Sequence, residues 1–234
     1  MQLFYSNNIQ GEQVFFSVED SRHIVQSLRM RAGKHLFLTD GEGHFYEAVI
    51  ISDDKRAVKA SIIETRTQTP TLPWLHLYVS PTKQAARMEW MLEKVIEMGA
   101  QYIYFIETKR TIRQKIKKER LEKIAISAMK QSLQCHMPQI HIGLNFKDAV
   151  DHAVGDKFIA WCDTQDANAL AQIVSPGKDT SVFIGPEGDF TDEEVNIAKA
   201  ANCQPVSLGA SRLRTETAGL YAASTLKVIN DMNM

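Results

Sequence analysis

The chain has 234 residues, 44% of them apolar and 24% charged, with a formal net charge of −1, which is typical of a folded globular protein and confines any polyanion binding to local basic patches. No stretch approaches the roughly 18 apolar residues that span a membrane, and the start, MQLFYSNNIQ, lacks the basic n-region of a signal peptide. Because its three cysteines are scattered, without metal-ligand spacing or a disulfide framework, we expect a cytoplasmic protein that holds no metal.

Residues 1–65 are predicted to form strands. In KHLFLTDGEGHFYEAVIIS, two apolar runs flank Asp40-Gly41, which is a strong hairpin signal. Gly41 and Gly43 also resemble the opening of a dinucleotide-binding loop, but no third glycine follows, so we favour a turn. The prolines of SIIETRTQTPTLPWL indicate a linker, and we expect one domain over residues 1–70 and a second over residues 74–234.

Strands and helices alternate in the second part of the chain. The stretches RMEWMLEKVIEMG and KERLEKIAISAMKQSL have helical periodicity, and Gly99 stands where a helix ends. The predicted strands between the helices are LHLYVS, YIYFI, KFIAWC, SVFIG and PVSLG. This alternation predicts an α/β domain with a mostly parallel sheet that helices cover on both faces.

The stretch VFIGPEGDFTDEEV is a predicted strand that leads directly into a helix. Thr191 and Glu194 have the spacing of a capping box, so the helix begins just after the glycines. Ligands of open α/β sheets bind beyond the carboxyl ends of strands. Gly185 and Gly188 would let the backbone approach a ligand and adopt a positive φ. Taken alone, a tight turn without a ligand explains the stretch equally well.

A second stretch, VSLGASRLRTETAGLYAAS, has the same order of strand, glycine, polar loop and helix. Its loop carries Arg212, Arg214 and Glu216, which are costly to bury without partners. Two such loops at strand ends predict the floor and wall of one ligand site.

The two motifs IGPEGDFTDEEV and LGASRLRTETA together resemble the RsmE family. These are the S-adenosylmethionine-dependent 16S ribosomal RNA (uracil-N3)-methyltransferases of the SPOUT superfamily. Similar residues at His23, Leu28-Arg29 and Asp40-Gly41, and in EKVIEMG, extend the resemblance over nearly the whole chain. The chain departs from the commoner family pattern at Leu133-Gln134, where Gly-Arg is usual, and at Arg212, which is displaced by one position.

The resemblance implies a small N-terminal PUA-like β-barrel that binds RNA, residues 1–70, and a C-terminal SPOUT α/β domain with a trefoil knot, residues 74–234. It implies methylation of N3 of one specific uridine in 16S ribosomal RNA of the small ribosomal subunit. S-adenosylmethionine would bind to two loops, with a third and weaker candidate near Trp161-Cys162-Asp163. The implied cofactor-binding residues are Gly185, Pro186, Glu187, Gly188, Leu208, Gly209, Leu213 and Thr215.

The reaction needs no covalent nucleophile, only alignment, a proton acceptor and donors facing the uracil carbonyl oxygens. The candidate catalytic residues are Arg214 for the uracil anion, Glu216 for the proton and Glu187 as a contact to cofactor or base. Each has a structural alternative. For Arg214 the alternative is an ion pair with Glu187 or Glu216. For Glu216 it is a favourable interaction with the dipole of the last helix. For Glu187 it is a hydrogen bond that orders its loop.

RNA binding needs positive surfaces despite the neutral total charge. The run KRTIRQKIKKERLEK is strongly basic, and a smaller cluster surrounds Arg29. By itself such a run is usually a solvated face, but with the resemblance it predicts RNA contacts. The candidates are His23, Arg29, Arg31, Arg110, Arg113 and Arg120.

The resemblance also implies a homodimer. The last helix, TETAGLYAASTLKVIN, carries a narrow stripe of Ala218, Ala222, Leu226 and Ile229, which we predict to form the two-fold interface; packing on the protein's own sheet is the alternative. Two other functions compete with methylation. One is a non-catalytic RNA-binding assembly factor of the same fold. The other is a nucleotide-dependent oxidoreductase, but YVSPTKQAARMEW lacks the glycine-rich loop that it would need.

Overall fold

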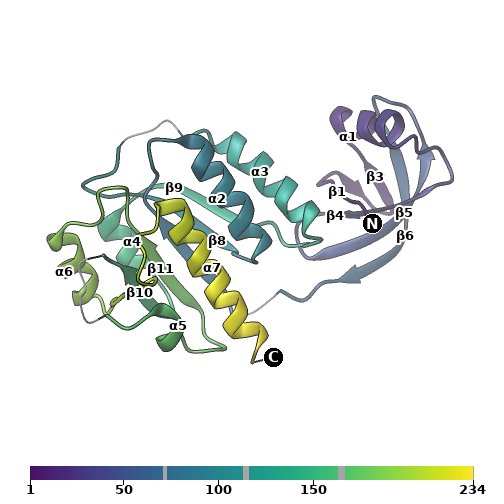
Figure 1. The fold of residues 1–234 in the computed structure, drawn as a ribbon. Coiled ribbons are helices and arrows are strands. Elements are labelled where there is room, and N and C mark those ends of the chain that lie inside the picture. Colours follow the sequence, from purple (N-terminus) through teal and green to yellow (C-terminus); the bar gives the residue numbers. More distant parts are fainter. Residues whose placement is uncertain (71–72, 113–115, 163–166, 234) are drawn as a thin grey trace. The chain divides into compact units, whose positions relative to one another are not determined.

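A computed structural model describes residues 1–70, 73–112, 116–162 and 167–233. The chain divides into two compact units. Unit 1 comprises residues 1–70 and 126–137, and unit 2 comprises residues 71–125 and 138–234 (Figure 1). The segment 126–137, which the sequence had placed in the second domain, is thus grouped with the first unit.

Unit 1 contains a six-stranded sheet in the order β1-β4-β5-β6-β3-β2. Its strands are β1 (Leu3–Tyr5), β2 (Ile9–Gln10), β3 (Gln13–Phe15), β4 (His35–Thr39), β5 (His44–Ser52) and β6 (Lys59–Thr67). The prediction of strands alone is wrong at one place, because α1 (Val18–Arg22) and the π-helix η1 (His23–Ser27) interrupt them. The hydroxyl of Ser17 accepts a hydrogen bond from the N–H of Asp20 (3.0 Å) and so caps this helix. The buried side of η1 carries Ile24, which joins the unit's apolar core.

The predicted hairpin is confirmed, since β4 pairs antiparallel with β5 around residues 40–43. The Asp40 carboxylate holds the turn by accepting hydrogen bonds from the backbone N–H of Glu42 (2.8 Å) and the hydroxyl of Tyr46 (2.8 Å). It also lies 2.6 Å from Nδ1 of His44. Burial raises the pKa of this carboxyl, but the hydrogen bonds from Glu42, Tyr46 and His44 outweigh burial and lower the pKa overall.

The turn packs closely on residues 135–137 of the same unit. Gly43 N–H donates to the carbonyl of Cys135 (2.8 Å) at a φ of +98°, and a Cβ at Gly43 would overlap the His136 ring. We expect Gly43→Ala to lower the free energy of unfolding by about 2–4 kcal/mol, through strain and overlap together. Gly33→Ala is the matched control, because Gly33 also has a positive φ but faces open space, and it should cost only about 1 kcal/mol. Equal losses in urea unfolding would contradict the overlap.

Unit 2 contains a six-stranded sheet in the order β12-β10-β11-β7-β8-β9, in which every pairing is parallel. The strands are β7 (Leu75–Val79), β8 (Tyr102–Glu107), β9 (Gln139–Asn145), β10 (Asp156–Ala160), β11 (Thr180–Ile184) and β12 (Gln204–Val206). The predicted parallel α/β sheet is therefore confirmed. The edge strand β9 was not predicted, although Ile140, Ile142 and Leu144 alternate with other residues along it.

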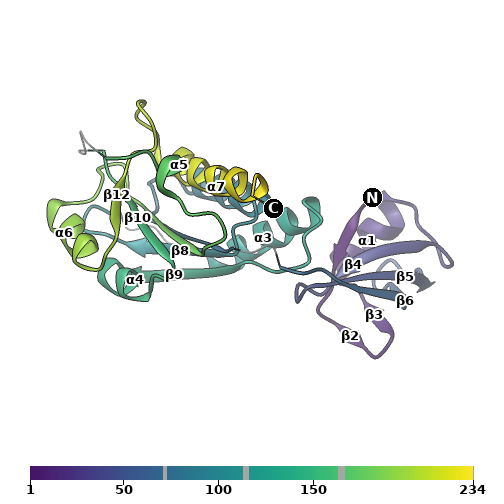
Figure 2. The same cartoon turned by 90° about the horizontal axis from the view of Figure 1, so that it is seen from below.

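Helices cover both faces of this sheet, as predicted. They are α2 (Ala85–Glu97), α3 (Lys118–Gln131, whose second half belongs to unit 1), α4 (Phe146–His152), α5 (Leu170–Ile173), α6 (Asp192–Ala200) and α7 (Thr215–Asp231). In Figure 2, α5 and α7 lie on one face and α4 and α6 on the other, and α2 packs against α7. The capping box of Thr191 and Glu194 is confirmed at the start of α6, and Gly99, with a φ of +92°, follows the end of α2. Among the helices of the described ranges, none has the length and apolar character needed to cross a membrane.

The small residues of α7 face their own unit. Ala218, Ala222 and Leu226 are buried, and a Cβ at Gly219 would lie 2.8 Å from Sδ of Met91 on α2. The prediction that this stripe forms a two-fold interface is therefore wrong, and the alternative, packing within the protomer, is right. The small side chains serve the close approach of α7 to α2 and β7.

Candidate functional site at the strand ends of unit 2

A cavity of about 800 Å³ opens beyond the carboxyl ends of β10, β11 and β12, where Ala160, Ile184 and Val206 form its floor. Its volume lies in the range of small-molecule sites, roughly 300–1,000 Å³. The loops that follow these three strands build its walls. The two motifs that the sequence singled out therefore meet at one site, in the position where open α/β sheets bind ligands.

The first wall is the loop after β11. Gly185, Pro186 and Glu187 line the cavity, whereas Gly188 does not. The prediction of a positive φ at Gly185 and Gly188 is wrong. Asp189 adopts the left-handed conformation instead, with a φ of +60°. Gly185 is needed for packing, since its Cβ would lie 3.1 Å from Oδ1 of Asp189.

Gly188 contacts a cationic side chain rather than the cavity. Its carbonyl accepts a hydrogen bond from Nη1 of Arg110 (2.5 Å), and its Cβ would lie 3.3 Å from Cδ of the same arginine. The absence of a side chain at Gly188 thus makes room for Arg110.

Asp189 joins two loops of the cavity. Its Oδ2 accepts a hydrogen bond from the N–H of Cys162 (3.0 Å), in the loop after β10, and its Oδ1 accepts one from the N–H of Phe190 (2.8 Å). Trp161 and Cys162 of the third predicted loop do line the cavity, while Asp163 lies outside the described residues. The sequence did not single out Asp189, although aspartate tolerates the left-handed conformation better than most residues do.

The second wall is the loop from Ser207 to Arg214. Leu208, Gly209 and Leu213 line the cavity as predicted. Gly209 has a φ of +112°, and its N–H donates to Oγ of Ser207 (3.1 Å). The hydroxyl of Thr215, at the start of α7, donates to the carbonyl of Gly185 (2.9 Å) and so ties the two walls together.

Arg214 is the N-cap residue of α7 and its side chain is exposed at the cavity. The expected alternative, an ion pair of Arg214 with Glu187 or Glu216, does not form. Glu187 instead accepts a hydrogen bond from the N–H of Lys83 (3.1 Å), which is the loop-ordering contact considered above. Within the described part of the chain, Arg214 has no ion pair or hydrogen bond to another side chain.

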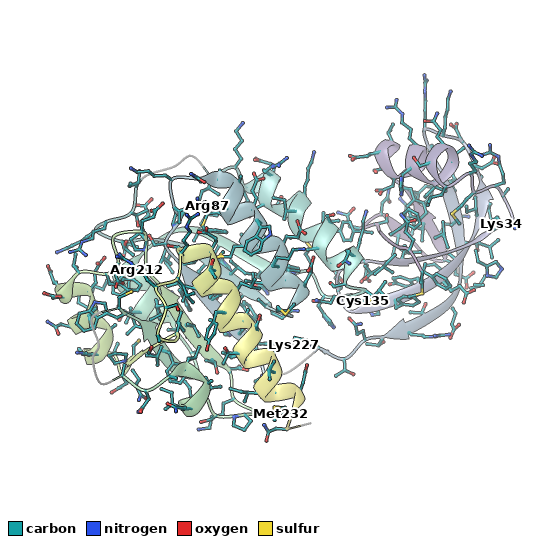
Figure 3. The ribbon with its side chains drawn as sticks, viewed as in Figure 1. Lys34, Arg87, Cys135, Arg212, Lys227 and Met232 are labelled. Atoms are coloured by element: carbon teal, nitrogen blue, oxygen red, sulfur yellow. The ribbon has the colours of Figure 1, made fainter. Side chains whose placement is uncertain are left out.

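Glu216 is almost completely buried, with 7% of its surface exposed. Its Oε1 lies 3.5 Å from Nε of Arg87, in the first turn of α2, while its Oε2 is buried and has no partner among the described residues. Both side chains line the cavity. Figure 3 labels Arg87, together with Arg212 in the loop that precedes α7. The sequence missed Arg87 because its contact with Glu216 joins residues far apart in the chain.

The candidate RNA-binding residues lie in both units, and several have partners within the protein. Arg110 donates to the carbonyls of Gly188 and Phe190, and Arg120 forms a bidentate pair with Glu89 (2.9 and 2.8 Å). In unit 1, Arg31 pairs with Asp53 at 3.8 Å and donates to the carbonyls of Val25 and Met30.

The remaining RNA-binding candidates in unit 1 are His23 and Arg29, which have fewer contacts within the protein. His23 Nε2 lies 2.7 Å from the side-chain nitrogen of Gln2, and Arg29 is exposed with a φ of +55°. Arg113 lies outside the described residues. In the described ranges, no group of three or more His, Cys, Asp or Glu side chains could hold a metal ion.

Comparison with known proteins matches this chain to two family models. Residues 69–227 match the RNA methyltransferase domain, and residues 16–63 match the RNA methyltransferase PUA domain. The crystal structure of a probable rRNA-methyltransferase from Porphyromonas gingivalis is 39% identical, covers 100% of both chains and superposes with a TM-score of 0.94. The ribosomal RNA small subunit methyltransferase E of Bacillus subtilis is 28% identical and covers 89% of this chain and 87% of its own length.

A further solved structure carries a ligand. The ribosomal RNA small subunit methyltransferase E of Neisseria gonorrhoeae, bound to S-adenosyl methionine, is 28% identical, covers 98% of both chains and has a TM-score of 0.87.

Proposed function

The chain belongs to the RNA methyltransferase family, as its resemblance to RsmE indicated, and we propose that it transfers a methyl group from S-adenosylmethionine to N3 of one uridine in 16S ribosomal RNA. The observation that carries this proposal is the meeting of both sequence motifs in a single cavity at the strand ends. The names of the relatives support an RNA of the small ribosomal subunit as the substrate, and we place the reaction in the cytoplasm.

The cavity suits the cofactor in size and in chemistry. About 800 Å³ accommodates a nucleoside with an amino-acid tail. Backbone groups of Gly185, Pro186, Leu208, Gly209 and Leu213, with Thr215 between the walls, would hold it. The trefoil knot implied by the resemblance is part of this proposal.

The bound cofactor supplies an electrophilic methyl group on a good leaving group, so the protein's task is to assist a weak nucleophile. In our proposal, Arg214 faces the carbonyl oxygens of uracil, where negative charge develops. The new bond from N3 to the methyl carbon forms as the bond from that carbon to sulfur breaks, and the proton of N3 passes to Glu216. Arg87 lies against one oxygen of Glu216, and the other oxygen is buried without a partner among the described residues, so the substrate would have to reach it from the cavity.

The two units would divide the work. We propose that residues 1–70, which include the PUA match, bind RNA through His23, Arg29 and Arg31, and that residues 74–234 bind the cofactor and form a homodimer. Arg110, Arg113 and Arg120 would extend the RNA contacts. Arg110 and Arg120 have intramolecular partners, but both residues remain exposed.

Mass spectrometry of 16S RNA from a deletion strain tests this function. We expect the loss of one N3-methyluridine, its return with the wild-type chain, and no return with Arg214→Ala. Full methylation in the deletion strain would refute the proposal. If Arg214→Ala restored the methyl group as well as the wild type does, the assigned chemistry would be wrong, and a non-catalytic role in assembly would be tested next by subunit profiles.

The dimer is expected to use exposed apolar side chains rather than the buried stripe. Tyr221 and Val228 are exposed and lie two turns apart on one side of α7, and Trp90 is exposed on the neighbouring α2. We expect Val228→Glu to convert a dimer into a folded monomer, because a two-fold axis brings each new charge close to its copy.

Light scattering at micromolar concentration gives the measurement. Ile63→Glu is the matched control, since Ile63 is an equally exposed apolar residue of unit 1, and this variant should remain dimeric. Ala222→Glu cannot serve as the test, because Ala222 is fully buried and the variant should unfold. A monomeric wild type that is fully active would end the dimer hypothesis.

A further inference from the structure

Four aromatic rings form a continuous stack across four neighbouring strands of unit 2. Phe183 on β11, Tyr78 on β7, Tyr104 on β8 and His141 on β9 are register partners in turn. Successive ring centroids lie 4.4, 4.3 and 4.6 Å apart, with interplanar angles of 13°, 8° and 11°. We call this set the ring ladder.

The two ends of the ring ladder differ in their surroundings. Phe183 and Tyr78 are fully buried, and Phe146 of α4 packs edge-on against Phe183. Tyr104 is half-buried and His141 is exposed. Because β9 is the last strand of its sheet, no strand among the described residues pairs with β9 on the side beyond His141. Core packing explains the inner rings, but it leaves the outer face of the His141 ring without a function.

The open end combines an aromatic face with a positive charge. Burial lowers the pKa of His141, and the positive charge of Lys118 lowers it further, so both effects favour the neutral ring. Lys118, in the first turn of α3, has an exposed side chain whose Nζ lies 3.7 Å from Oε1 of Glu122; this exposed pair is weak and leaves the ammonium open to a phosphate. An exposed aromatic ring within the electrostatic reach of a cation matches a nucleotide, because a base stacks on the ring while a phosphate approaches the cation. An apolar protein segment would gain nothing from Lys118.

We propose that the outer face of His141 is a stacking site for an unpaired base of the RNA, with Lys118 as the contact to its phosphate. This inference rests on the proposed function for the identity of the RNA, but the binding itself can be measured without methyl transfer. The site lies on the edge strand β9, outside the cavity that would hold the cofactor.

Fluorescence anisotropy with a labelled oligouridylate of about ten nucleotides tests the site in the full-length protein. His141→Ala should weaken binding about tenfold, the effect of losing one base stack. His141→Phe should restore the affinity, because it keeps the ring. Ile142→Ala is the matched control: Ile142 is an exposed neighbour whose side chain points to the opposite face of the same strand, and its loss should change nothing.

Two readouts separate this proposal from its alternatives. S-adenosylmethionine affinity should be the same in all three variants, since His141 and Ile142 lie outside the cavity. Thermal unfolding should show that all three are folded, with at most a small loss of stability in His141→Ala from the missing stack on Tyr104. Equal RNA affinity of His141→Ala and wild type overturns the proposal, as does a wild type that does not bind the oligonucleotide. A changed mass of His141→Ala in light scattering, with unchanged RNA affinity, would assign this edge to contact between copies of the chain and also overturn it. Methylation by the wild type is scored separately and bears only on the proposed function.

Discussion

Replacing Arg214 by alanine is expected to lower the rate of methylation by about 100- to 1,000-fold while changing the affinity for S-adenosylmethionine by no more than about twofold. The side chain is exposed at the cavity and has no partner among the described residues, so its charge is available to the substrate. A donor that faces developing charge acts mainly in the transition state, and its loss therefore appears in kcat.

Arg212→Ala is the control for this prediction. Arg212 lines the same cavity two residues earlier, so the two variants remove the same charge from different positions. Arg214→Lys should recover part of the rate, because it restores the charge without the planar fork. Single-turnover kinetics and calorimetry provide the measurements. Equal losses of rate and cofactor affinity in Arg214→Ala would make Arg214 a cofactor ligand instead.

Local patterns in the sequence predicted much of unit 2 and the place of the site. The alternation of strand-like and helix-like hydrophobic patterns predicted the parallel sheet. The spacing of Thr191 and Glu194 predicted where α6 begins. The glycine-containing ends of two strands gave two loops of one cavity. Each of these features depends on neighbours in the chain, which is the information that a single sequence carries.

The features that escaped prediction depend on contacts between distant residues. Arg87 is separated from Glu216 by more than half of the chain, and no local pattern connects them. The left-handed backbone conformation was expected at Gly185 and Gly188, but Asp189 adopts it instead. In that conformation its carboxylate accepts a hydrogen bond from the N–H of Cys162. The partner of the α7 stripe was misassigned for a related reason. Periodicity identifies an apolar face, but it does not say whether the same protomer or a second copy covers that face.

Glu216 and Arg87 provide a test in which stability and activity respond differently. Arg87→Met leaves the Glu216 carboxylate buried without its cation, which should lower the free energy of unfolding by about 1–2 kcal/mol. This is less than the ~3–5 kcal/mol of a fully buried pair, because the Arg87 side chain keeps 31% of its surface exposed and water screens the interaction. Glu216→Gln keeps the shape of the side chain and should remain folded, but it removes the proton acceptor and should lower the rate about 100-fold or more.

The double variant Arg87→Met/Glu216→Gln decides between a catalytic and a structural pair. With no charge left to bury, its stability in urea unfolding should return close to that of the wild type. Its rate should stay as low as that of Glu216→Gln, because the acceptor is still missing. If the pair served only to anchor the start of α7 to α2, activity would recover together with stability. Recovery of both quantities in the double variant would therefore remove Glu216 from the chemistry, and loss of both would point to a collapsed cavity.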